Sequence, residues 1–150
     1  MKIKEQILSR EQMKHLQELG VDTSDASMVW IKQDSTLLPD NIKELWWVDT
    51  YYDSLKPMVE QDDSGFVQTY TIGDLIKKLP EELEIEHKVY CREIIMFNDL
   101  ISVSYYNNVE VKLLFSIDNT DDKKSTLIKL LYMTLCWVAE KQKELLEVKK

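Results

Sequence analysis

The stretch KVYCREIIMFNDLISVSYYNNVEVKLLFSI, residues 88–117, decides the fold class of this chain. It contains three runs rich in β-branched and aromatic residues, a composition that favours strands: 88–97, 101–106 and 109–117. Asn98-Asp99 and Asn107-Asn108 separate the runs, and these residue types tolerate the positive φ angles of tight hairpin turns. The pattern therefore predicts a three-stranded antiparallel meander.

Helices are expected near both ends of the chain. Ser9 and Gln12 can form a capping box at the start of a helix over residues 10–19, and Gly20 can end that helix. A long final helix is predicted over residues 124–147. Its apolar stripe comprises Leu127, Ile128, Leu131, Leu135 and Val138.

The segment YTIGDLIKKLPEEL, residues 70–83, has the clearest helix start and stop signals in the sequence. Thr71 and Asp74 can cap a short helix, and Pro80 ends it because the residue before a proline is pushed out of helical geometry. Gly73 is a single glycine and does not make a phosphate-cradling loop. Helix formation explains each of these features without a functional site.

The N-terminal half contains two further predicted strands, MVWIKQD (28–34) and LWWVDTYY (45–52). The second has a helical alternative, which Pro57 disfavours. In that alternative one helix face would carry Trp47, Tyr51, Leu55 and Met58. Together the patterns predict a single α+β domain over residues 1–150. The domain would contain one antiparallel sheet of four to five strands, made of a hairpin and the meander. It would also contain three helices, in the element order α-β-β-α-β-β-β-α, with the C-terminal helix packed centrally on the sheet.

Composition indicates a folded chain without a membrane span. Hydrophobic residues make up 44% and charged residues 31% of its 150 residues. The longest apolar stretch, residues 127–139, is interrupted by Lys129 and is shorter than the ~20 residues that cross a bilayer. The N-terminus lacks the apolar core of a signal peptide. Only two cysteines, Cys91 and Cys136, are present, and a cytoplasmic location is expected.

The sequence predicts no catalytic residue, no cofactor and no metal site. It lacks a nucleophile elbow and the glycine-rich nucleotide-binding motifs, and it has only three glycines and two histidines. The one local group of metal-ligand types is Glu84, Glu86 and His87. If these residues lie on a strand, His87 points away from the two carboxylates, which opposes a shared metal. The net charge of −8 also disfavours direct binding of nucleic acid.

The aromatic cluster in residues 45–52 is the feature that packing of a core explains least well. As a strand, residues 45–52 would place Trp47 and Tyr51 on one face and Trp46 and Tyr52 on the other. Two interpretations are open: a strand buried on both sides, or a strand that offers one face to a partner. The second makes Trp46, Trp47, Tyr51 and Tyr52 the candidate partner-binding residues.

The predicted function is a non-enzymatic module that binds another protein. One alternative is an acidic nucleic-acid mimic that inhibits a DNA- or RNA-binding protein, and another is a small enzyme that uses dispersed carboxylates. Self-association as a homodimer is also expected, because an antiparallel meander leaves a strand edge that a second copy could cover.

The order of motifs resembles small uncharacterised proteins encoded in bacteriophage and mobile-element regions of gut-type bacteria. The resemblance runs from about Met13 to Gln142, and the segment 35–66 is longer than in that group. It implies an accessory role in binding, without an assigned activity or catalytic residue to transfer. The motifs that carry it are LQELG, MVWIKQD, TIGDLIKKLP, ISVSYY and STLIKLLYMTLCWVAEKQ.

Overall fold

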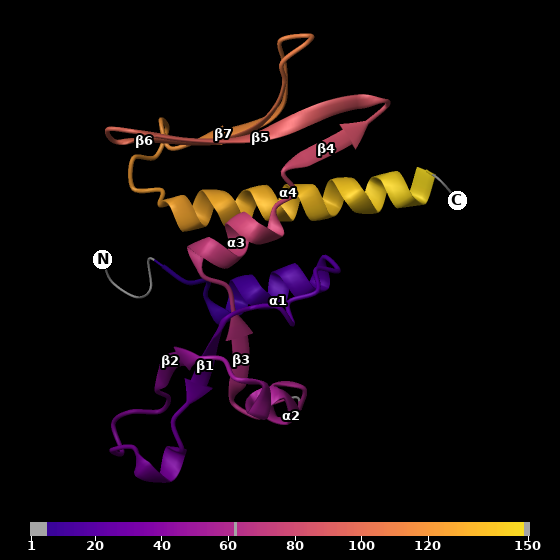
Figure 1. The fold of residues 1–150 in the computed structure, drawn as a ribbon. Coiled ribbons are helices and arrows are strands. Elements are labelled where there is room, and N and C mark those ends of the chain that lie inside the picture. Colours follow the sequence, from indigo (N-terminus) through magenta and orange to yellow (C-terminus); the bar gives the residue numbers. More distant parts are fainter. Residues whose placement is uncertain (1–5, 62, 149–150) are drawn as a thin grey trace. The chain divides into compact units, whose positions relative to one another are not determined.

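The computed structural model describes residues 6–61 and 63–148 and divides the chain into two compact units, Met1–Asp74 and Leu75–Lys150. Each unit combines helices with an antiparallel sheet (Figure 1), so the α+β prediction is confirmed. The strands form two sheets, of three and four strands, instead of the expected single sheet. One domain over residues 1–150 stays a prediction.

The sheet of the N-terminal unit has the order β2-β1-β3. Its strands are β1 (Met28–Lys32), β2 (Trp46–Thr50) and β3 (Phe66–Thr69). Between β1 and β2, Met28 lies opposite Thr50 and Lys32 opposite Trp46. Between β1 and β3, Met28 lies opposite Thr69 and Ile31 opposite Phe66. The predicted hairpin partners β1 and β2 are confirmed, whereas β3 is a strand that the sequence pattern did not predict.

Two α-helices of this unit contact β3: α1 (Arg10–Glu18) and α2 (Lys56–Val59). The capping box of Ser9 and Gln12 is present at the start of α1, and Gly20 has a φ of +87° just after its end. Pro57 lies in the first turn of α2, where a helix tolerates proline. The helical alternative for residues 45–58 is therefore correct only for residues 56–58, which lie in α2. The 3₁₀ turns η2 (Ser35–Leu37) and η3 (Asp53–Leu55) complete the unit.

The main chain of Leu8 joins the N-terminal segment to this sheet. Its amide donates to the Tyr70 carbonyl at 3.0 Å. Its carbonyl accepts two side-chain hydrogen bonds, from the Thr69 hydroxyl at 2.7 Å and from the Trp30 indole at 2.9 Å. Leu8 and Thr69 are fully buried, so these bonds form where water cannot replace them.

The C-terminal unit contains the predicted meander. The sheet order is β4-β5-β6-β7, with β4 (Glu82–Ile85), β5 (Lys88–Phe97), β6 (Leu100–Asn107) and β7 (Lys112–Asp118). Asn98 has the expected positive φ, 54°, in the turn between β5 and β6. The unpredicted strand β4 is joined to β5 by Glu86 and His87, whose φ angles of 53° and 66° are typical of a two-residue hairpin turn.

The last two helices are α3 (Ile72–Lys78) and α4 (Leu127–Val148). The Thr71 hydroxyl accepts from the Asp74 amide at 3.1 Å at the start of α3, as predicted. The Thr71 amide also donates to the Asp74 carboxylate at 3.0 Å, which completes a capping box. At the other end, the Arg92 guanidinium donates to the carbonyls of Ile76 and Leu79 at 2.7 and 2.8 Å. These charge-assisted bonds satisfy carbonyls that a helix end leaves without a partner.

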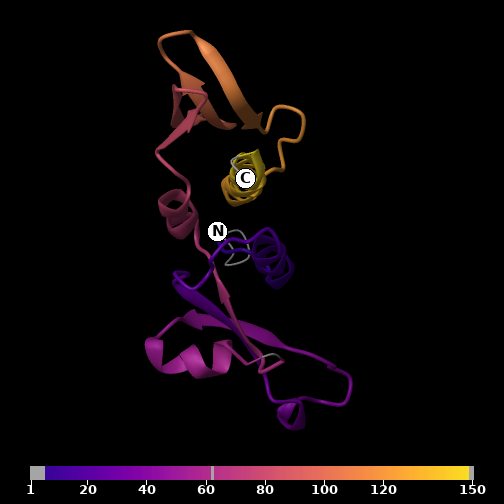
Figure 2. The ribbon, with the colours of Figure 1, turned by 90° about the vertical axis from the view of Figure 1, so that its right-hand side faces the viewer.

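The C-terminal helix α4 packs on one face of the four-stranded sheet, as predicted. Its Trp137 ring stacks on Phe115 with centroids 4.5 Å apart and on Tyr105 at 6.2 Å. Figure 2 looks along α4 and shows it beside one face of this sheet. Among residues 6–61 and 63–148, no helix has the length and apolar character needed to cross a membrane.

We predict that the two bonds to the Leu8 carbonyl are coupled. Thr69→Val and Trp30→Phe should each lower the free energy of unfolding of the N-terminal unit by about 1 kcal/mol. The double variant should lose roughly 1 kcal/mol more than the sum, because the buried carbonyl would then lack both side-chain donors. Native-state hydrogen exchange of amides in β1 and β3 measures these energies. Additive losses would contradict the coupling.

Candidate functional site

The structure places the four predicted aromatic residues along one edge of the N-terminal sheet. Trp46 and Trp47 begin β2, while Tyr51 and Tyr52 follow its end. The Trp47 side chain is 41% exposed and Tyr52 is 62% exposed, whereas Trp46 and Tyr51 are half-buried. A strand buried on both sides is therefore wrong for this segment. We call residues 45–52 the aromatic edge. They comprise β2 and its flanking residues, of which Leu45 and Tyr52 are exposed.

The two tryptophans lie on opposite faces of the sheet, as the alternation predicted. Trp46 pairs with Lys32, and Trp47 pairs with Ile31. Directly paired residues share a face, and successive residues alternate between faces. The aromatic edge is thus lined on both faces, and its four predicted residues do not form one flat patch.

Backbone polar groups of β2 point to the open side of the edge. The Gln33 amide donates to the Leu45 carbonyl at 2.8 Å, and the Tyr51 amide donates to the Ser27 carbonyl at 3.0 Å. In an antiparallel pair every second residue bonds to the neighbouring strand, so residues 45, 47, 49 and 51 face β1. The amides and carbonyls of Trp46 and Val48 consequently point away from β1, where the sheet has no further strand.

One end of the edge is already closed by a side chain. The Thr50 amide donates to its neighbour, the Asp49 carboxylate, at 2.7 Å. This local bond satisfies the donor that would otherwise extend the open ladder beyond Val48. The accessible part of the edge is therefore the segment around Trp46 and Val48.

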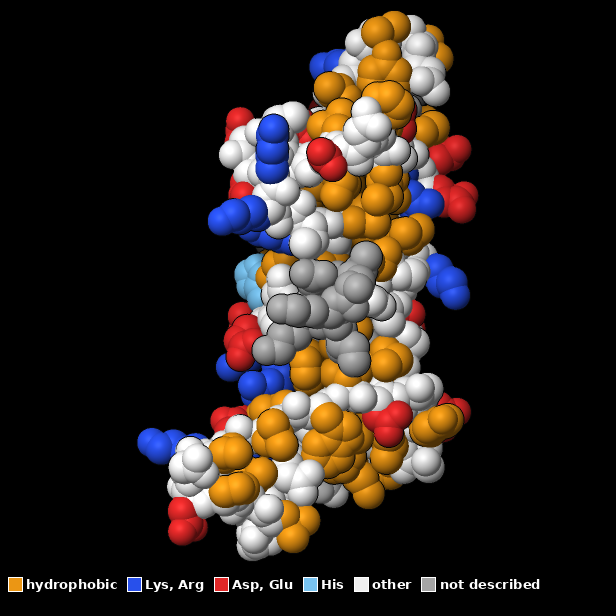
Figure 3. Space-filling model, turned by 90° about the vertical axis from the view of Figure 1, so that its left-hand side faces the viewer, with side chains coloured by type: hydrophobic (Ala, Val, Ile, Leu, Met, Phe, Trp, Pro, Cys, Tyr) orange, Lys and Arg blue, Asp and Glu red, His pale blue; other side chains and the backbone are white. Residues whose placement is uncertain are grey.

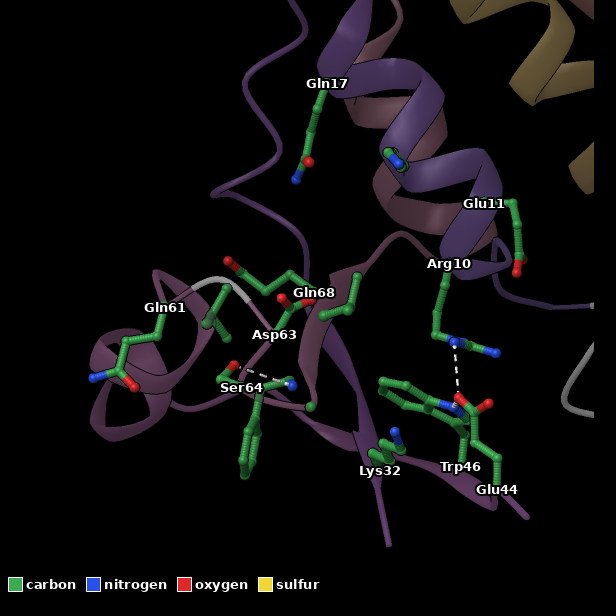
Figure 4. Close-up of a pocket in the computed structure, with 15 residues that line it drawn as sticks. Arg10, Glu11, Gln17, Lys32, Glu44, Trp46, Gln61, Asp63, Ser64 and Gln68 are labelled. Atoms are coloured by element: carbon green, nitrogen blue, oxygen red, sulfur yellow. Dashed lines mark hydrogen bonds and ion pairs between the residues drawn. The ribbon is translucent and has the colours of Figure 1, made fainter.

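Arg10 and Glu44 hold the half-buried Trp46 in place (Figure 4). The Arg10 guanidinium carbon lies 4.0 Å from the centre of the Trp46 ring, and an Arg10 nitrogen lies 3.5 Å from a Glu44 carboxylate oxygen. The Trp46 indole N–H donates to that same oxygen. A cation over an indole face is electrostatically favourable, so the three side chains form one clasp between α1 and β2.

The clasp forms one end of a groove of about 790 Å³ within the N-terminal unit. One wall is α1, and the other is formed by Val59, Gln61 and residues 63–68. Gln17 and Gln68 are anchored by hydrogen bonds, to the Thr23 hydroxyl and to the carbonyls of Ser24 and Ala26. Besides these two and the clasp, the lining consists of Glu11, Lys14, Lys32, Val59, Gln61, Asp63, Ser64, Gly65, Phe66 and Val67.

The groove is lined by charges of both signs. Glu44 is occupied by Arg10 and Trp46, and the carboxylates of Glu11 and Asp63 also line the groove. Lys14 and Lys32 also line the groove. The hydrogen bond from Trp46 holds the pKa of Glu44 below its ordinary value, and the positive charges of Lys32 and Arg10 add smaller effects in the same direction.

Burial shifts the pKa values of two ionisable groups outside the groove, Tyr70 and Cys136. The buried Tyr70 hydroxyl donates to the Asp25 carboxylate at 2.6 Å, and burial raises the pKa of Tyr70 strongly. Burial likewise raises the pKa of Cys136, which favours the thiol over the reactive thiolate. Within the described ranges, no three His, Cys, Asp or Glu side chains are placed to hold a metal ion. Glu86 and His87 lie in a turn and not on a strand.

Sequence reasoning missed the groove and the clasp. Arg10 and Lys14 are one turn apart in α1, a spacing that places two cations on the same helix face. That spacing could have identified them as neighbours, but it carries no information about the sheet they face. Glu44 is in a polar segment before β2 and has no local motif.

We predict that the clasp opens in acid. Because the pKa of Glu44 is depressed in the folded chain, the clasp is present above that pKa and is lost as pH falls through it. The NMR signal of the Trp46 indole N–H should therefore shift with a midpoint below 4.5, the ordinary value of a glutamate. Glu44→Gln should abolish this titration. A midpoint at or above the ordinary value would contradict the assignment.

Comparisons with family models, curated proteins and solved structures give no match for this chain.

Proposed function

We propose that this chain is a non-enzymatic protein-interaction module whose N-terminal unit binds an extended segment of a partner along the aromatic edge. The supporting observation is the open backbone of Trp46 and Val48 on an edge strand. An extended peptide can add to such an edge as a further strand, with main-chain hydrogen bonds providing affinity and alternate side chains providing specificity.

Exposed aromatic side chains supply the anchors that such binding needs. Trp47 and Tyr52 are exposed at either end of the edge, and Trp and Tyr dominate the energetics of protein interfaces. Side chains of a bound strand would alternate between the face of Trp47 and the face of Trp46. On the Trp46 face they would meet the clasp and the end of the groove, so the two faces would select different residue types.

The short length of the edge suits selective binding. β2 has five residues, and the Asp49 carboxylate closes the ladder at Thr50. Long, flat and apolar edges invite uncontrolled association, and natural sheets shorten or block their edges to avoid it. The aromatic edge therefore offers a limited number of backbone pairs, and affinity depends on the side chains beside them.

The cellular setting is part of the same proposal. The resemblance to phage and mobile-element proteins implies an accessory role, which a binding module can fill without catalysis. Cys91 and Cys136 are both free thiols, which supports a reducing compartment such as the cytoplasm.

Val48→Pro tests the backbone part of this proposal. The Val48 amide points to the open side, so proline there removes no bond within the sheet and is tolerated on an edge strand. Peptides would be selected from a displayed random library on the immobilised full chain and measured by fluorescence anisotropy. Val48→Pro and Trp47→Ala should each weaken the selected peptides by about tenfold or more, since each removes at least about 1.4 kcal/mol of binding free energy.

Leu37→Ala is the matched control, because Leu37 is exposed in the same unit but lies outside β2. It should leave the affinity unchanged. Hydrogen exchange of β1 and β3 amides shows whether each variant keeps the sheet. Equal affinity of folded Val48→Pro and of the unaltered chain would refute strand addition, as would a library that yields no binding peptide.

A further inference from the structure

The four-stranded sheet of the C-terminal unit has one face that α4 does not cover. Trp137 of α4 stacks on Tyr105 and Phe115, which are paired across β6 and β7 and so share the covered face. Residues that alternate with them point to the opposite side, which we call the open face. Among the described residues of this unit, no helix packs on that face (Figure 2).

The open face carries several exposed apolar side chains. Cross-strand pairing places Phe97 beside Leu100 near the β5–β6 turn, and Phe97 is 68% exposed. In Figure 3, hydrophobic side chains gather over this unit, at the top of that view. The exposed apolar residues of the open face are Val89, Ile95, Phe97, Leu100 and Leu113.

All charged side chains that the strands contribute to the open face are acidic. They are Glu82, Glu84, Glu93 and Asp118, and each is exposed. The cationic residues of the same strands point the other way: Lys88 pairs with Ile85, Arg92 with Tyr105 and Lys112 with Asn107, all on the covered face. The open face is thus apolar and anionic, with no lysine or arginine from these four strands.

We propose that the open face binds a cationic amphipathic helix of a partner protein. The apolar stripe of such a helix would cover the exposed valine, isoleucine, leucine and phenylalanine side chains, as helices cover the faces of sheets in layered folds. Lysine and arginine residues bordering that stripe would meet the four carboxylates. This site lies in the other unit and does not depend on the aromatic edge.

Charge disfavours two other occupants. A second copy docked face to face would bring two sets of carboxylates together, and such like-charge contacts oppose association. A membrane surface with anionic lipids would repel the same groups, since peripheral binding relies on lysine and arginine beside the apolar residues. A cationic helix satisfies both the apolar and the acidic part of the open face.

Binding of a synthetic helix to the full chain tests this inference. The probe is a leucine–lysine peptide of about 18 residues, roughly 27 Å long as a helix, with leucine on one face. Calorimetry should detect binding that weakens by about tenfold or more in Phe97→Ser. The double variant Glu84→Gln and Glu93→Gln should weaken it by about threefold at low salt, and this difference should vanish at about 0.5 M salt.

Val109→Ser and Glu140→Gln are the matched controls, because both side chains are exposed in the same unit but outside the open face. They should bind as the unaltered chain does. A peptide of the same composition without an apolar face should bind at least about tenfold more weakly. Amide NMR shifts on adding the peptide to the unaltered chain should cluster in β5, which tests the site even if a variant fails to fold.

Several results would overturn the inference: no binding of the leucine–lysine peptide, equal binding of the scrambled peptide, or unchanged affinity in folded Phe97→Ser. A dimer in sedimentation that Phe97→Ser dissociates would assign the open face to a second copy. Binding to phosphatidylcholine vesicles that Phe97→Ser abolishes would assign it to a membrane. None of these results bears on Val48 and the aromatic edge.

Discussion

The buried carbonyl of Leu8 is the constraint on which the N-terminal unit depends. It accepts hydrogen bonds from Trp30 in β1 and from Thr69 in β3, so one main-chain group links the N-terminal segment to two strands. Ser9 follows at once and caps α1. Because the helix begins at this fixed point, its first residue, Arg10, lies over Trp46. The clasp and the groove beside it are therefore consequences of where the chain is attached to the sheet.

Local signals in the sequence predicted most elements of this fold. Both capping boxes, the Asn98 turn and the β5–β6–β7 meander follow from residues close together in the chain, and all are present. The missed strands β3 and β4 have four residues each. Such short runs carry little periodicity, and pairing with β1 or β5 stabilises them as strands. The division of strands between two sheets likewise depends on non-local pairing.

The candidate site shows the same limit. From the sequence, Trp46 and Trp47 could be identified as aromatic residues that burial in a core does not fully explain. Their position on opposite faces of the sheet follows from strand geometry. Their exposure could not, because it depends on β2 lying at an edge and not in the middle of the sheet. Glu44 and Lys32 contribute to the site only through the register that places Lys32 opposite Trp46. Residue type therefore identified the candidate residues, while strand order determined which of their side chains and backbone groups are exposed.

The two proposed surfaces differ in the force that would make each selective. Binding at the aromatic edge would rest on backbone hydrogen bonds and aromatic contacts, which depend on shape and change little with salt. Binding on the open face would rest on apolar contacts and on attraction between the carboxylates and a cationic partner. Salt would screen that attraction and so weaken the preference for a cationic partner. The net charge of −8 alone would not distinguish them. The strand register directs Lys88, Arg92 and Lys112 to the covered face, so the charged side chains that the strands contribute to the open face are all carboxylates. That is why we expect a cationic partner there.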